Sequence, residues 1–179
     1  PALLEQNPVG MGRALQVYAG LVRRLLADNG GFVVQEWGTA FQVGFVDCTN
    51  ALRWCLQLQE ALLEADWPES ILTLKDATLQ HWTGPEPLVV QDLDNAAHRA
   101  GFGGPRQYLW RGLRVAMGIH VGAAFCSEEP STGQMTIVGP MVREASALAS
   151  KATGGHILAS AATLEAIGDA WSDVGDPFV

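Results

Sequence analysis

Lysine is scarce in this chain, and that scarcity bears on what the chain can bind. Only two lysines, Lys75 and Lys151, accompany nine arginines, against 19 acidic residues, and the formal net charge is −8. A protein that follows a phosphate backbone needs a concentrated basic face. Two lysines and scattered arginines do not form one, so the composition argues against nucleic-acid binding.

Long apolar runs and cysteine motifs are also missing. No stretch approaches the roughly 20 apolar residues of a membrane span, and no signal-peptide pattern is visible. We therefore expect no direct membrane contact within this chain, while an anchor elsewhere in a longer protein stays open. The three cysteines, Cys48, Cys55 and Cys126, match no zinc or redox spacing. They favour reduced thiols in a cytosolic compartment, with Cys55 filling the core on a helix face.

The residues that are present suit one globular domain. Hydrophobic residues make up 48% of the 179 positions and charged residues 17%, which is ample for one buried core. Helical periodicity predicts helices over 11–29, 48–65, 140–152 and 161–167. Extended runs predict strands over 32–37, 40–46, 113–121, 123–126, 135–138 and 156–159, with a tight hairpin turn at Gly38-Thr39. Strands interleaved with helices indicate an α+β or α/β sandwich.

The segment 66–109 breaks this pattern with prolines and glycines. We interpret it as a peripheral insertion, because it holds too few periodic apolar residues to build a core. Asp92 and Asp94 within it suit a solvated loop better than a cation site. The glycines of 101–104 lack the Lys-Ser/Thr that a phosphate loop requires.

Several stretches, taken in order, carry a resemblance to a known family. Residues 110–122 read W-R-G-L-R-V-A-M-G-I-H-V-G, similar to W-x-G-L-R-V-R-V-G-I-H-T-G. Residues 32–45 are similar to Y-E-V-K-T-I-G-D-S-F-M-V-A-F, 135–148 to Y-D-Y-Y-G-x-x-x-N-x-A-x-R-x, and 154–160 to G-G-Q-V-L-x-S. These patterns belong to class III adenylate and guanylate cyclase catalytic domains, and the chain most resembles the receptor-type adenylate cyclases of trypanosomatid parasites.

The resemblance implies a fold and a chemistry. The fold is α+β, a ferredoxin-like α/β sandwich with a mostly antiparallel central sheet. It would form a single domain over 1–179 that is truncated at both ends. In active relatives two aspartates hold two Mg²⁺ or Mn²⁺ ions, while a Lys and an Asp or Thr contact the adenine. An Asn and an Arg one helical turn apart stabilise the transferring phosphoryl group, and a second cyclase domain completes the site.

Transferred residue by residue, that chemistry is largely absent from this chain. Thr39 stands at a metal-aspartate position, and a neutral hydroxyl is a poor substitute for a carboxylate in binding hard cations. Gln35 stands at the adenine-lysine position and Thr136 at the second base position, where some active relatives tolerate threonine. Arg143 and Ala147 stand at the positions of the transition-state Asn and Arg. The other metal aspartate belongs to a strand expected before the first residue.

We therefore interpret the chain as a catalytically degenerate cyclase homology domain with no cofactor. It would act as a structural, dimerisation or regulatory module through the face that relatives use to pair with another cyclase-like domain or a neighbouring protein. The alternative is an active purine nucleotidyl cyclase that converts ATP to cAMP and pyrophosphate with Mg²⁺ or Mn²⁺, either through an unusual metal site or with a complementary partner chain. A third is a nucleotide sensor in which Gln35 and Thr136 still contact a base. The resemblance places the domain in the cytoplasm, as the intracellular part of a membrane or flagellar protein.

Four residues leave narrower alternatives open. Arg143 near a helix start suits a bound phosphate, or a solvated pair with Glu144 or another surface acid. His120 within an apolar strand suits a structural role better than a catalytic one. Trp37 beside the hairpin turn suits either an anchor for a partner or packing into this domain's own core. Glu36 should face away from Gln35, because neighbouring strand residues point to opposite sides.

Overall fold

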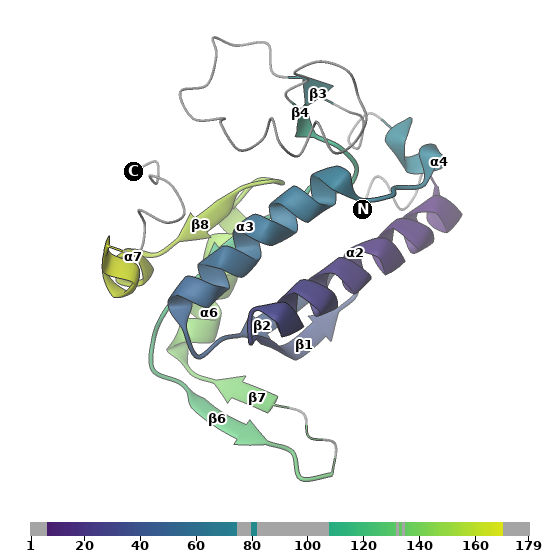
Figure 1. Ribbon diagram of the computed structural model, residues 1–179. Helices are drawn as coiled ribbons and strands as arrows, with labels where there is room; N and C mark the ends of the chain where they lie inside the picture. The colour runs from purple at the N-terminus through teal and green to yellow at the C-terminus, as the bar shows by residue number, and fades with distance from the viewer. Residues whose placement is uncertain (1–6, 75–79, 82–107, 132, 134, 170–179) are drawn as a thin grey trace. The chain divides into compact units, whose positions relative to one another are not determined.

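A computed structural model describes residues 7–74, 80–81, 108–131, 133 and 135–169 (Figure 1). The chain divides into two compact units, one made of residues 1–18 and 60–114 and the other of 19–59 and 115–179. The elements run in the order α2 Pro8–Asp28, β1 Phe32–Trp37, β2 Ala40–Gly44, α3 Cys48–Glu64, α4 Glu69–Leu72, β3 Gln80–His81, β4 Tyr108–Trp110, β5 Met117–Ile119, β6 Phe125–Glu128, β7 Met135–Val138, α6 Pro140–Lys151, β8 Ile157–Ala159 and α7 Ala161–Ile167.

Helix α2 begins one turn earlier than its apolar periodicity predicts. The Asn7 side chain accepts a 2.8 Å hydrogen bond from the Gly10 amide and so caps the first turn. Pro8 fits at the first helical position, where its missing N–H would have no helical partner. One stripe of the helix is buried, at Ala14, Tyr18, Val22 and Leu26. The sequence signal for this start was present in Asn7-Pro8, and the apolar spacing alone did not reveal it.

Helix α3 follows its predicted bounds closely. Asp47 caps it, because its carboxylate accepts hydrogen bonds from the amides of Thr49 at 2.7 Å and Asn50 at 3.3 Å. Cys55 lies on the buried face of the helix and is 3% exposed. Burial raises the pKa of its thiol from the ordinary 9.0 to about 12. The prediction that Cys55 fills the core is confirmed.

The strands pair two by two in the described part of the chain. β1 with β2, β3 with β4, and β6 with β7 are antiparallel, while β5 pairs with β8 in parallel. The predicted strand over 113–121 is wrong in extent, because only Met117–Ile119 forms a ladder. Before it, the Val115 carbonyl accepts from the Gly155 amide and from the Gln59 side chain. The predicted strand over 123–126 lies later, at Phe125–Glu128.

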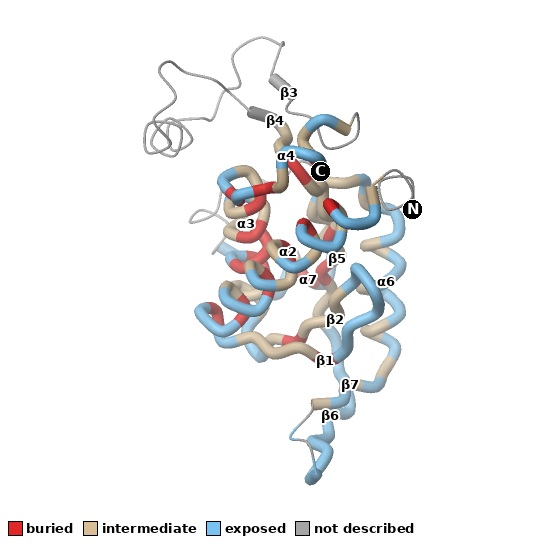
Figure 2. Tube along the Cα trace, turned by 90° about the vertical axis from the view of Figure 1, so that its right-hand side faces the viewer, coloured by how far each residue is buried: buried red, intermediate tan, exposed pale blue. Residues whose placement is uncertain are grey.

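Glycine at position 118 lets helix α6 lie directly on β5. A Cβ built on Gly118 would lie 2.3 Å from the Ala149 amide nitrogen and 2.4 Å from the Ala145 carbonyl oxygen. Both contacts are to helix backbone, so a side chain at this position has no room. Helix α6 has no buried residue, and Figure 2 shows it in the colours of intermediate and exposed positions only. The helix is therefore held mainly by its close approach to β5 and leaves a broad outer face in solvent.

The start of the 66–109 segment belongs to a core, which corrects the prediction that this segment is peripheral. Trp67 is 3% exposed and Ile71 fully buried. The Trp67 indole donates to the Leu62 carbonyl at 2.8 Å, which ties this stretch to the end of α3. The prediction failed because two isolated large side chains leave no periodic pattern. Asp92, Asp94 and the glycines of 101–104 lie outside the described residues, and the reading of one domain with an insertion stays a prediction.

Candidate functional site

The hairpin of β1 and β2 has two chemically different faces. On one face the Glu36 carboxylate forms an ion pair with Arg23 of α2, with 2.5 Å between the charged atoms. Phe41 lies directly opposite Glu36 in the ladder, and the Arg23 guanidinium carbon lies 5.4 Å from its ring centroid. This face is therefore turned to the helix, and Glu36 is engaged there. The prediction that Glu36 points away from Gln35 agrees with this arrangement.

The outer face of the hairpin carries Gln35 and Trp37. Gln35 lies opposite Gln42 and Trp37 opposite Ala40, and cross-strand partners share a face. At Val34 a bulge places two residues of β1 opposite one of β2. The bulge changes which residues of β1 share the face of Gln35 and Trp37. Trp37 is 52% exposed. The interpretation that Trp37 packs into this domain's own core is therefore wrong.

Thr39 sits in the turn of the hairpin and is exposed. Gly38 before it adopts φ 57°, a left-handed conformation that favours glycine in such a turn. The hairpin and the loop after it hold two carboxylates, and both are used elsewhere: Glu36 pairs with Arg23, and Asp47 caps α3. The described residues contain no group of three His, Cys, Asp or Glu side chains that could hold a metal ion. A pair of Mg²⁺ or Mn²⁺ ions thus does not fit the residues present at this turn.

Strand β7 packs against β1 and brings a second predicted position nearby. The Ile137 side chain reaches the hairpin, since its Cδ1 would lie 2.8 Å from a Cβ built on Gly44. Thr136 and Val138 alternate to the exposed side of β7. The positions of Gln35 and Thr136 therefore belong to strands that contact each other.

Arg143 and Ala147 lie one turn apart on the exposed face of α6. Ser146 between them turns its hydroxyl back to the Val142 carbonyl at 2.8 Å, so it offers no free hydroxyl donor. The one ion pair found in the described ranges joins Arg23 and Glu36. Arg143 is thus not paired with Glu144 in this structure, and the residue is exposed.

His120 belongs to a structural network. Its Nδ1 lies 2.8 Å from the Ser160 hydroxyl, which also accepts from the Thr163 amide at the start of α7. Thr163 is fully buried, and its hydroxyl donates to the Ile119 carbonyl at 3.2 Å. These bonds fasten α7 to the end of β5. The prediction of a structural role for His120 agrees with these contacts.

Comparison with known proteins decides the family. Over 151 residues the chain is 38% identical to an adenylate cyclase of Mycosarcoma maydis, which covers 84% of this chain and 5% of that protein. It is 28% identical over 163 residues to a receptor-type adenylate cyclase of Trypanosoma congolense, covering 90% of this chain and 21% of that protein. A solved structure of Trypanosoma brucei adenylate cyclases in their monomeric state matches 98% of this chain and 74% of that one, with a TM-score of 0.73 at 22% identity.

The chain belongs to the class III nucleotidyl cyclase domain family. The prediction of the family is confirmed, and so is the α+β cyclase fold. The fungal protein is more identical to this cyclase domain than the trypanosome one is. The domain spans only 5% to 21% of these two relatives, and no family model matches it.

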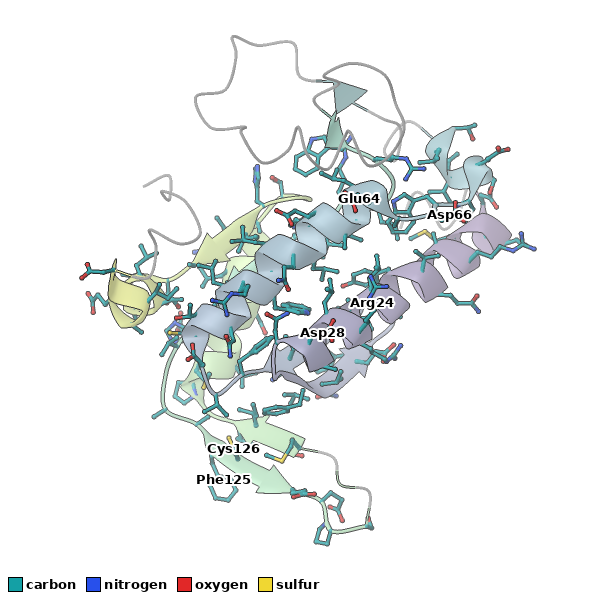
Figure 3. All side chains as sticks on the ribbon, viewed as in Figure 1. Arg24, Asp28, Glu64, Asp66, Phe125 and Cys126 are labelled. Atoms are coloured by element: carbon teal, nitrogen blue, oxygen red, sulfur yellow. The ribbon has the colours of Figure 1, made fainter. Side chains whose placement is uncertain are left out.

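Two features of the cyclase domain's surface escaped prediction. Gln42 lies opposite Gln35 because the two-residue turn fixes the pairing of the strands beside it. The sequence therefore contained the signal for this pair. The exposed pair of Phe125 on β6 and Val138 on β7 had no such signal. They lie opposite each other and are 71% and 59% exposed, and Phe125 projects away from the helices (Figure 3).

None of the helices in the described ranges has the length and apolar character needed to cross a bilayer.

Proposed function

We propose that this cyclase domain is catalytically degenerate and acts as a binding or regulatory module within a larger protein. The observation that carries the proposal is Thr39, exposed in the hairpin turn at the metal-aspartate position implied by the family. A threonine hydroxyl is neutral, and Mg²⁺ and Mn²⁺ prefer carboxylate oxygens. Glu36 and Asp47 are the nearest carboxylates in sequence, and their partners hold them elsewhere.

The positions implied for transition-state stabilisation support the same proposal. Ala147 has no hydrogen-bond donor, so it cannot stabilise the charge on a transferring phosphoryl group. Arg143 places a long cationic side chain where a short amide would orient the ribose, and the two side chains differ in reach and charge. Both half-sites of a cyclase pair are therefore impaired in this chain. A complementary partner would not restore either one.

The exposed apolar side chains support a partner. Trp37 on the outer hairpin face and the Phe125–Val138 pair all lie in the unit made of 19–59 and 115–179. Large aromatic side chains that stay exposed are typical of interface anchors. The family resemblance implies that this hairpin face meets another cyclase-like domain or a neighbouring protein. A receptor-type relative supports a place in the intracellular part of a longer protein.

Metal binding tests the proposal without relying on turnover. The purified chain is titrated with Mn²⁺ in the presence of ATP, and free Mn²⁺ is followed by electron paramagnetic resonance. We expect the free signal to match a solution of Mn²⁺ and ATP alone. Thr39→Ala is the matched control, because it removes the hydroxyl without adding charge. Mn²⁺ binding by the native chain that Thr39→Ala abolishes would contradict the proposal.

The second candidate is an active adenylate cyclase. It is favoured by the relatives, since the Mycosarcoma maydis and Trypanosoma congolense proteins are both adenylate cyclases. This candidate requires metal ligands other than Thr39, supplied by residues outside the described ranges or by another chain. Metal-dependent cAMP formation in the full-length protein that persists after deletion of every other cyclase domain would favour it.

A further inference from the structure

Arg114 presents buried donors that have no partner in the described part of the chain. It lies four residues after β4, with its guanidinium carbon 5.5 Å from the Trp110 ring centroid. Its Nε and Nη2 atoms are shielded from solvent and make no hydrogen bond there. Arg111, three residues earlier, differs sharply. Its Nη1 donates to the carbonyls of Ala65 and Leu63 at the end of α3.

The backbone around Arg114 is held in place on one side. Gly112 has φ 75° and is buried, and a Cβ there would lie 2.2 Å from the Trp67 indole nitrogen. That indole in turn donates to the Leu62 carbonyl. With Arg111 bonded to the end of α3, the segment from Trp110 to Arg114 is fixed within its own unit. The guanidinium is therefore a positioned group and not a loose surface side chain.

The two unpaired atoms have a specific geometry. Nε and Nη2 form one edge of the guanidinium plane and direct two N–H groups side by side. That edge matches the paired oxygens of a carboxylate or a phosphate, which arginine binds in a bidentate manner. Leaving such donors buried and unpaired costs free energy, and nearly all buried donors in native proteins are paired. A group that presents two acceptor oxygens would therefore satisfy both donors at once.

We propose that this edge of Arg114 binds an oxyanion, a carboxylate or a phosphate, while Trp110 supports the cation from its ring face. Solvent does not reach the two nitrogens, so a free oxyanion would have to displace the atoms that cover them. Arg114 lies outside the hairpin and helix positions of the proposed function, and the two proposals stand or fall separately. The oxyanion has two sources, a free phosphate compound or a carboxylate of the chain itself, and their chemistry at the guanidinium is the same.

Inorganic phosphate distinguishes these sources. The melting temperature of the full chain is measured against phosphate concentration at constant ionic strength, for the native chain, Arg114→Lys and Arg13→Lys. Lysine keeps the charge and lacks the paired N–H edge, and Arg13 is an exposed arginine of the same unit. If free phosphate binds, a concentration 100 times its dissociation constant raises the melting temperature of the native chain and Arg13→Lys by about 5 °C or more. Arg114→Lys shows no such rise.

A second measurement covers the internal source. The proton on Arg114 Nε is followed by nitrogen-15 NMR without phosphate, with Arg114→Lys used for assignment. A downfield, slowly exchanging proton, together with a lower melting temperature for Arg114→Lys than for Arg13→Lys, identifies a carboxylate of the chain. The proposal is overturned if phosphate stabilises no variant selectively and the Nε proton shows no hydrogen bond.

Discussion

A single methyl group at position 118 should dislodge the helix that carries Arg143 and Ala147. In Gly118→Ala the new Cβ would lie 2.3 Å from the Ala149 amide nitrogen and 2.4 Å from the Ala145 carbonyl oxygen. Favourable contact begins near 3.5 Å, so α6 must move outward by about 1 Å. Both clashing groups are backbone atoms, and no side-chain rotation relieves them.

The expected cost is that of overpacking a close-packed contact. Inserting one methyl group where no space exists destabilises a protein by about 1–3 kcal/mol. For a chain of this size that corresponds to a fall in melting temperature of roughly 2–12 °C. The magnitude falls in the upper part of the range if α6 cannot shift as a rigid body.

Gly20→Ala is the matched control, because it makes the same substitution in the same unit. A Cβ at Gly20 would meet nothing within 4 Å, and the residue lies inside α2. Alanine is a better helix former than glycine by about 1 kcal/mol, so this variant should melt at a higher temperature. Circular dichroism during heating gives the melting temperature of each variant, and urea titration gives its free energy of unfolding. If Gly118→Ala is as stable as the native chain, the close packing of α6 on β5 is refuted.

Further predictions concern three residues. Cys55, with its thiol pKa raised to about 12 by burial, should resist iodoacetamide at pH 8 in the folded chain while exposed Cys126 reacts. Because an unfolded thiol ionises near 9.0, this raised pKa should also lower stability as the pH rises above 9, and a Cys55→Ala variant that retains the same slope would contradict that. Asp47→Ala should cost about 1 kcal/mol through loss of the α3 cap, with Asp47→Asn retaining most of it in urea titrations. Trp37→Ala should leave the melting temperature within about 1 °C, since the ring is half exposed, yet weaken association with a second cyclase-like domain in analytical ultracentrifugation; unchanged association would leave this face without a partner.

Local sequence patterns predicted the bounds of β1 and β7 better than those of the strand over 113–121. The bounds of β1 and β7 match prediction, and glycines mark the ends of both strands, at Gly31 and Gly38 and at Gly133 and Gly139. The run over 113–121 is just as apolar, yet its first backbone groups bond to Gln59 and Gly155 instead of to a neighbouring strand. An apolar run indicates that a segment is buried, but it does not indicate which group its backbone carbonyls accept hydrogen bonds from.

The assignment of Gln35, Thr39 and Arg143 to site positions stays a prediction, and the structure adds how these residues are oriented. The register of the family motifs gave Gln35, Thr39 and Arg143 their places, and the structure puts Gln35 on the outer hairpin face. The bulge at Val34 fixes that face, and no residue pattern in β1 signals a bulge there. Burial of Trp67 was equally invisible, because Gly112, which lies against its indole, comes from a distant part of the chain.

The most direct test of catalytic degeneracy is the formation of cyclic nucleotide by the purified chain. It is incubated at high protein concentration with ATP or GTP and either Mg²⁺ or Mn²⁺, and cAMP, cGMP and pyrophosphate are measured. If the domain is catalytically degenerate, product stays at the level of a blank without protein, for the native chain and for Thr39→Ala alike. Metal-dependent product above the blank that Thr39→Ala abolishes would contradict it.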